Sequence, residues 1–230
     1  MPVSLMQSIT ATIAAVGVLT GCSVTPDPKA ATKENFATAI NAWISKHPLC
    51  VSPSSINEVG AHDSWPRRVS NDIPLGPAHD EVAKARESNR ASFDALVQVG
   101  LLNTKTTTVQ TAGVTLPAIE YNLTAEGKKA IAGDQARFHS EAASLCYGRP
   151  VVDEVDDFTA PAAMYGGVTV SHVSYRYHVT DIPAWARDAR VQAAFPRLAH
   201  DIPGPLDGQA TVALMGQGWM HADAASPGPQ

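Results

Sequence analysis

The hydrophobic positions of the chain first follow a helical period. Over residues 32–46 apolar side chains recur every three to four residues, which predicts an amphipathic helix with one buried face: Phe36, Ile40, Trp43 and Ile44. Thr32 is expected to cap this helix, and Pro48 to stop it. A second helical stretch runs over residues 80–99 and is expected to end at Gly100.

The pattern then changes to strands joined by a turn. A threonine-rich strand is predicted up to Gln110, a turn at Ala112-Gly113, and a return strand up to Leu123. A helix is expected to start at Thr124, in the stretch Thr124-Ala125-Glu126-Gly127-Lys128-Lys129-Ala130-Ile131. Over residues 80–132 this order resembles the wing and closing helix of winged-helix domains. The resemblance implies a fold, and it does not imply DNA binding.

The last third of the chain alternates between apolar and polar residues. Residues 167–180 form the clearest strand, with a change of phase near Ser171-His172 that indicates a bulge or a strand that switches faces. One short helix is predicted from Pro183 until Pro196, and another strand over residues 209–221. Three strands and one helix predict a small antiparallel α+β unit.

The first residues read as a targeting segment. Residues 8–21 carry no charge and end in small side chains, as the hydrophobic region of a signal peptide does. A run of about 14 residues is short for a membrane-spanning helix, which needs roughly 20. The run ends in Leu19-Thr20-Gly21-Cys22, which resembles the lipobox of bacterial lipoproteins. The alternative is a buried apolar helix with an incidental cysteine.

The lipobox resemblance implies how the chain is processed and where in the cell it is located. It implies that residues 1–21 are removed, that Cys22 is acylated, for example with palmitate, and that membrane lipid is a partner through Cys22. Residues 22–31 contain two prolines and are expected to be an extended lipidated tether. Because Ser23 rather than aspartate follows the cysteine, the expected location is the outer membrane, facing the periplasm.

The number of cysteines and the net charge lead to two further expectations. With Cys22 lipidated, Cys50 and Cys146 remain as an even pair in an oxidising compartment, which predicts a disulfide; two buried thiols are the alternative. With a net charge of −5 the chain has no excess of basic residues to attract phosphate groups, so no nucleic-acid partner is expected.

Candidate chemistry is sparse. None of the His-Glu-x-x-His, Gly-x-Ser-x-Gly, Cys-x-x-Cys or glycine-rich phosphate motifs occurs in the sequence, and no catalytic, cofactor or metal residue is predicted. His62-Asp63 and His200-Asp201 are interpreted as solvated loop pairs. The acidic cluster Asp153, Glu154, Asp156 and Asp157 is interpreted as a solvated face, with cation binding as the alternative.

These observations predict an α+β protein in two parts. A winged-helix-like subdomain is expected over residues 32–149, an antiparallel subdomain with one helix over 150–221, and a disordered tail over 222–230. The expected function is that of a non-enzymatic envelope lipoprotein that binds a protein or another envelope component. One alternative is a periplasmic hydrolase whose site assembles from His62, His172 or His200. A cytoplasmic winged-helix regulator is a third reading.

Overall fold

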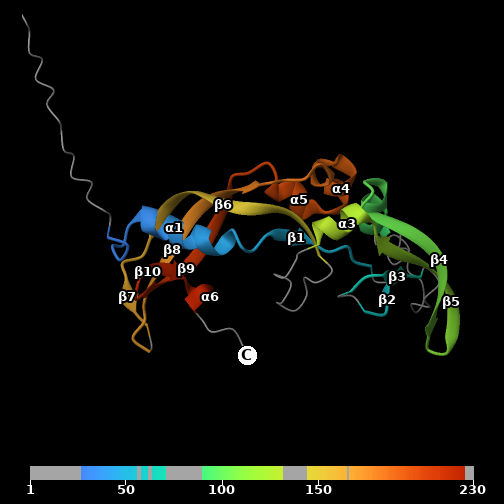
Figure 1. The fold of residues 1–230 in the computed structure, drawn as a ribbon, viewed down its shortest axis with the longest axis horizontal. Helices are drawn as coiled ribbons and strands as arrows, with labels where there is room; N and C mark the ends of the chain where they lie inside the picture. Colours follow the sequence, from blue (N-terminus) through green and yellow to red (C-terminus); the bar gives the residue numbers. More distant parts are fainter. Residues whose placement is uncertain are drawn as a thin grey trace, which may run out of the picture.

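The computed structural model describes residues 27–55, 58–61, 64–70, 90–131, 144–164 and 166–225. These ranges form an α+β fold with two antiparallel sheets, which lie toward opposite ends of an elongated molecule (Figure 1). The predicted α+β class is confirmed. The assignment of segments to the two parts differs from the prediction.

One sheet has six strands. Its order is β1 (Leu49–Val51), β6 (Leu145–Phe158), β8 (Thr169–Thr180), β9 (Leu206–Met215) and β10 (Gly218–His221), and β7 (Ala162–Ala163) pairs with β8. The two ends of the chain therefore build this sheet together. Where β6 pairs with β8 the register shifts after Val152 and after Val155, and where β1 pairs with β6 it shifts after Leu49, while β8 and β9 stay in regular register through Ser171. The bulge predicted near Ser171 of β8 is therefore not found there, and the irregularities lie on the neighbouring strand β6.

Helix α1 (Lys33–Ile44) covers one face of the six-stranded sheet. It begins as predicted, because the Thr32 hydroxyl accepts a hydrogen bond from the Asn35 N–H. Phe36 and Ile40 are fully buried against strand residues such as Val173 and Val212. The prediction placed this helix with the winged-helix-like part; its apolar face instead packs on the other sheet.

The second sheet has four strands in the order β2 (Glu58–Val59), β3 (Arg67–Val69), β5 (Val114–Leu123) and β4 (Leu102–Thr111). The β4–β5 hairpin turns at Ala112 and Gly113, both with positive φ, as the sequence predicts. Thr124 caps α3 (Ala125–Ala130), also as predicted. Gly127 is required there, because a Cβ atom would lie 2.1 Å from the Leu101 carbonyl oxygen.

A hydrophobic core joins the two sheets. It combines residues of the four-stranded sheet and of helical residues 90–98 with Leu145 and Tyr147 at the start of β6. The other half of β6, with Val152 and Val155, belongs to the core under α1. The predicted boundary at Pro150 therefore falls inside one strand. β1 pairs with β6 only as far as Gly148. Among the described strands, β6 therefore forms the edge of the sheet at Pro150, and an edge strand tolerates proline.

The segment between β8 and β9 is more helical than predicted. It forms a 3₁₀ turn η2 (Ala184–Arg187), α4 (Ala189–Ala194) and α5 (Pro196–Asp201). Pro196 starts a helix rather than ending one, because the missing N–H of proline is harmless in the first turn. Likewise, the strand predicted over 209–221 is a hairpin of β9 and β10.

The ends of the described chain are ordered by contacts with the body. Residues 27–30 form a turn in which the Asn35 side-chain amide donates to the carbonyl oxygens of Asp27 and Ala30, both at 2.8 Å. The predicted tether over 22–31 is thus shortened from its C-terminal side. At the other end, α6 (Ala222–Ala225) replaces the start of the predicted tail. None of the described helices has the length and apolar character needed to cross a membrane.

Candidate functional site

The face of the six-stranded sheet opposite α1 carries polar side chains on β8 and β9. On β8, Val173 and Tyr175 point to the core under α1, so the residues between them point the other way. This polar face pairs side chains across β8 and β9: His172 with Thr211, Ser174 with Gln209, and Arg176 with Asp207. One face of the sheet is therefore buried by α1, and the other presents hydrogen-bonding groups.

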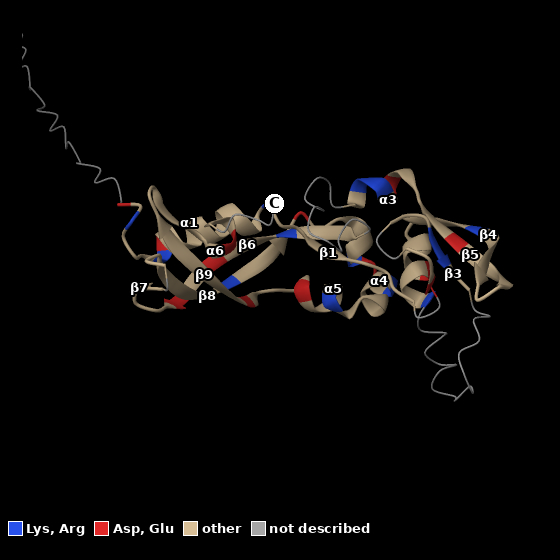
Figure 2. Cartoon of the chain, turned by 90° about the horizontal axis from the view of Figure 1, so that it is seen from below, with Lys and Arg blue, Asp and Glu red and all other residues tan. Residues whose placement is uncertain are grey.

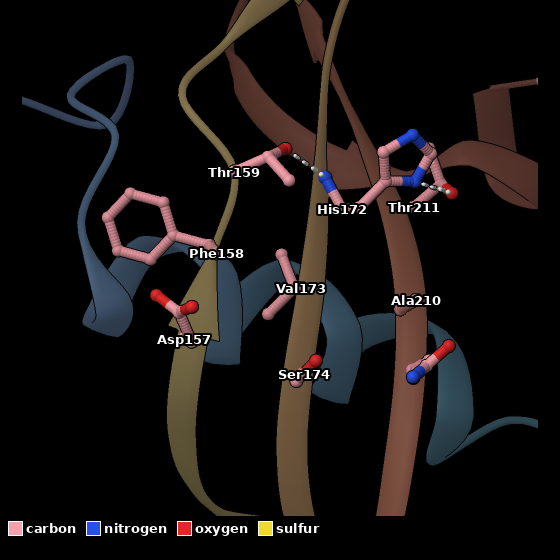
Figure 3. Close-up of a pocket in the computed structure, with 9 residues that line it drawn as sticks. Asp157, Phe158, Thr159, His172, Val173, Ser174, Ala210 and Thr211 are labelled. Carbon is pink, nitrogen blue, oxygen red and sulfur yellow. Dashed lines mark hydrogen bonds between the residues drawn. The ribbon is translucent and has the colours of Figure 1, made fainter.

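A hollow of about 320 Å³ lies on this polar face, and Figure 3 shows the residues that line it. The His172 ring nitrogen Nδ1 lies 3.0 Å from the Thr211 hydroxyl, and the His172 backbone N–H donates to the Thr159 hydroxyl at 3.0 Å. Ser174, Gln209 and Asp157 add a hydroxyl, an amide and a carboxylate. This set of donors and acceptors suits a polar ligand held by hydrogen bonds.

The charged part of the polar face is internally paired. Arg176 bridges to both Glu154 and Asp156, and His178 Nδ1 lies 2.6 Å from the Asp153 carboxylate. The acidic cluster remains solvent-exposed, as predicted, but three of its members have basic partners on β8. Among the described residues, no three His, Cys, Asp or Glu side chains are placed to hold a metal ion.

A cluster centred on the buried Asp201 carboxylate forms a second polar feature. The Tyr147 hydroxyl donates to Asp201, Arg197 Nε lies 3.3 Å from the same carboxylate oxygen, and His200 Nδ1 lies 3.0 Å from the other. Burial would raise the pKa of Asp201, but the hydrogen bonds from Tyr147, His200 and Arg197 outweigh it and lower that pKa. Burial, and then the bond to Asp201, raise the pKa of the Tyr147 phenol. The cluster fastens α5 to β6.

Of the three histidines named for the alternative hydrolase site, the two that the structure describes, His172 and His200, do not converge. Arg197 and Asp201, which lie on α5 with His200, are close enough to Tyr177 to influence its pKa. Tyr177 is five residues from His172 on β8, which is roughly 16 Å along the strand, so His200 lies far from His172. His62 lies outside the described residues. The prediction that His200 and Asp201 form a solvated loop pair holds for the solvation of His200, whose side chain is 76% exposed, but it is wrong for Asp201, which is buried at the end of α5. Pro196, a favoured first residue of a helix, was the signal for this element.

The cysteine pair is placed as predicted. Cys50 of β1 and Cys146 of β6 lie opposite each other, with their sulfur atoms 2.07 Å apart. This bond joins the segment that follows α1 to the start of β6, at the junction of the two sheets. Cys22 lies outside the described residues, so its lipidation stays a prediction.

Relatives do not add to this picture. No protein-family model, curated protein or solved structure matches the chain. Function therefore has to be inferred from the residues and their arrangement.

Proposed function

We propose that the chain is a lipid-anchored envelope protein that binds a polar envelope component through the polar face of its six-stranded sheet. The observation that carries the proposal is the contrast between the two faces of that sheet. α1 buries one face with Phe36 and Ile40, while the other presents His172, Ser174 and Gln209 around a hollow of about 320 Å³. A face of this kind offers specific hydrogen bonds without an assembled catalytic group.

Two features support the envelope as the location. The sequence Leu19-Thr20-Gly21-Cys22 resembles a lipobox. The Cys50–Cys146 pair is at bonding distance, and disulfides persist in oxidising compartments such as the periplasm. Outer-membrane sorting is part of the proposal because Ser23 follows the lipobox cysteine.

The winged-helix resemblance remains a proposal about the fold of the other end. The hairpin β4–β5 and the Thr124 cap of α3 support it. We do not extend it to nucleic acid. The net charge is −5, and Figure 2 shows acidic and basic residues interspersed over both sheets.

The anchor is tested by acylation. Cells producing the parent chain or the Cys22→Ser variant are labelled with an alkyne fatty acid. We expect label on the parent only, and an unprocessed precursor for the variant. Equal labelling of the two proteins would disprove the anchor.

The binding surface is tested by photocrosslinking in intact cells. A photoreactive amino acid replaces Ser174 or Gln209 on the polar face, and Thr38 on the exposed side of α1 serves as the matched control. We expect discrete adducts with a protein or a glycan from the two sheet positions and none from position 38. Identical adducts from all three positions would reject the polar face as the binding surface.

A further inference from the structure

Exposed apolar side chains gather at one end of the molecule. Among the described residues, four large hydrophobic side chains are exposed: Met164 by 55%, Val168 by 41%, Met215 by 39% and Val114 by 51%. The first three belong to the six-stranded sheet or its turns, whereas Val114 lies at the tip of the β4–β5 hairpin. Figure 1 places that hairpin at the opposite end of the molecule from β7 and β10.

Register shows that the first three residues are neighbours. Val170 of β8 pairs with Ala213 of β9, so Val168, two residues before, and Met215, two residues after, lie at the same end of adjacent strands. The Met164 N–H donates to the Val168 carbonyl oxygen at 2.8 Å, which places Met164 in the same turn region. We refer to Met164, Val168 and Met215 as the apolar tip.

The first described residues leave the body at this same end. The Trp219 indole N–H donates to the Lys29 carbonyl oxygen at 3.1 Å. Pro28 and Met215 line one hollow of about 310 Å³, together with Gly218 and Met220 of β10. The hydrogen bonds from Asn35 to Asp27 and Ala30 hold this segment on the body. The point from which the chain continues toward Cys22 is therefore fixed beside the apolar tip.

Chain length limits how far this end lies from the lipid. Five residue steps separate Asp27 from Cys22, and each spans no more than about 3.6 Å, so the separation is at most about 18 Å. If Cys22 carries acyl chains in the bilayer, the end that carries Asp27 is held at the membrane surface. Apolar side chains held there gain by entering the boundary between headgroups and acyl chains.

We infer that the apolar tip is a second membrane contact, in which Met164, Val168 and Met215 enter the lipid interface beside the acylated cysteine. This inference rests on the proposed anchor and gives the protein a defined orientation. The six-stranded sheet lies next to the bilayer, and the β4–β5 hairpin points away from it (Figure 1). The occupant of the tip is lipid, and no protein partner is required there.

Lipid photocrosslinking tests the contact. The full acylated chain is reconstituted in vesicles of phosphatidylethanolamine and phosphatidylglycerol, with a photoreactive amino acid at position 164, 215 or 114. Position 114 is the matched control, because Val114 is apolar and its exposure of 51% lies between those of Met164 and Met215. Because only the tip enters the interface, we expect about tenfold more lipid adduct from positions 164 and 215 than from position 114.

A charge substitution sharpens the test. With the probe at position 168, the double substitution Met164→Asp and Met215→Asp should lower lipid adducts about tenfold, because carboxylates keep the tip in water. Val114→Asp should leave the adducts unchanged. Fatty-acid labelling of each variant shows separately that Cys22 is still acylated.

The outcomes separate the two proposals. Equal lipid adducts from positions 114 and 215 on an acylated chain, or none from position 215, would overturn the apolar tip and leave the anchor intact. Protein adducts in place of lipid adducts in whole cells would also overturn it. A chain without fatty-acid label would overturn the anchor and, with it, this inference.

Discussion

The two sheets both border apolar cores, but they differ in the charge that they bury. Under α1, the six-stranded sheet has an apolar core in which the Phe36 ring meets Phe158 and Trp219 edge-on, with ring centroids 4.8 and 4.9 Å away. The four-stranded sheet also has an apolar core, with Val69 and Tyr121, and in addition it contains a buried ion pair between Arg67 and Glu58, whose side chains are 3% and 1% exposed. Both cores gain stability by removing apolar surface from water, and the core beside the four-stranded sheet also depends on the pairing of its buried charges.

The environment of Arg67 shows how that pairing is completed. Its guanidinium group makes two hydrogen bonds to the Glu58 carboxylate and a third, at 3.0 Å, to the Ser52 hydroxyl. The guanidinium carbon also lies 5.8 Å from the centroid of the Trp65 ring and 5.5 Å from that of Phe93. The comparison predicts that truncating a buried apolar side chain is harmful in either core, and that isolating a charge is also harmful beside the four-stranded sheet.

The largest effect is expected in the apolar core under α1. Phe36→Ala removes a fully buried ring and leaves a cavity, which should lower the free energy of unfolding by about 3–5 kcal/mol. Urea unfolding followed by fluorescence measures the change. Thr38→Ala on the exposed side of the same helix is the control, and a similar loss in both variants would contradict the assigned packing of α1.

The next effect concerns the ion pair. Glu58→Gln leaves the Arg67 guanidinium buried without its counter-charge, and should lower the free energy of unfolding by about 3 kcal/mol. Combining Glu58→Leu with Arg67→Met should restore most of this loss, because no uncompensated charge remains. If the double variant in urea unfolding is as unstable as the sum of its single substitutions, the two charges are not coupled.

The smallest effect is a pH dependence at the junction between the sheets. Asp201 has a lowered pKa in the folded chain, so its contribution to stability is present above its ordinary pKa near 4 and is lost as pH falls through the folded value. Tyr147→Phe removes one hydrogen bond that lowers this pKa. The acid loss should then be smaller and should be complete at a higher pH, with stability at neutral pH about 1 kcal/mol lower.

Urea midpoints measured from pH 7 down to pH 2.5 show the difference between the Tyr147→Phe variant and the parent. Tyr175→Phe, in the core under α1 and away from Asp201, is the matched control and should keep the acid profile of the parent. Superimposable profiles for all three proteins would mean that the Tyr147 hydroxyl does not hold Asp201 in its ionised form.

Local elements could be predicted from the sequence because their signals are local. Thr32 and Thr124 cap helices through their own hydroxyls, and the Ala112-Gly113 turn needs only two residues with positive φ. The pairing of strands was not predictable in this way. The apolar face of α1 shows that the helix must be covered, but nothing near residue 40 specifies a strand that begins at Leu145.

The candidate site shows the same limit. His172 was identified as a histidine on a strand, but its partner Thr211 comes from β9, and only the register of β8 with β9 brings them together. The pairing of the acidic cluster with Arg176 and His178 likewise depends on the pairing of β6 with β8. The Cys50–Cys146 bond could be predicted from the sequence because the prediction needed only the number of cysteines and not the geometry of the fold.

The six-stranded sheet combines residues 49–51 with residues 145–221, so it can form only late in the synthesis of the chain. Synthesis reaches Leu145 about 100 residues after the end of α1, which takes roughly 5–20 s at ordinary elongation rates. The segment that builds the four-stranded sheet is complete earlier, at Leu123. During that interval Phe36 and Ile40 have no strand to pack against, so α1 is the segment that we expect molecular chaperones to engage first.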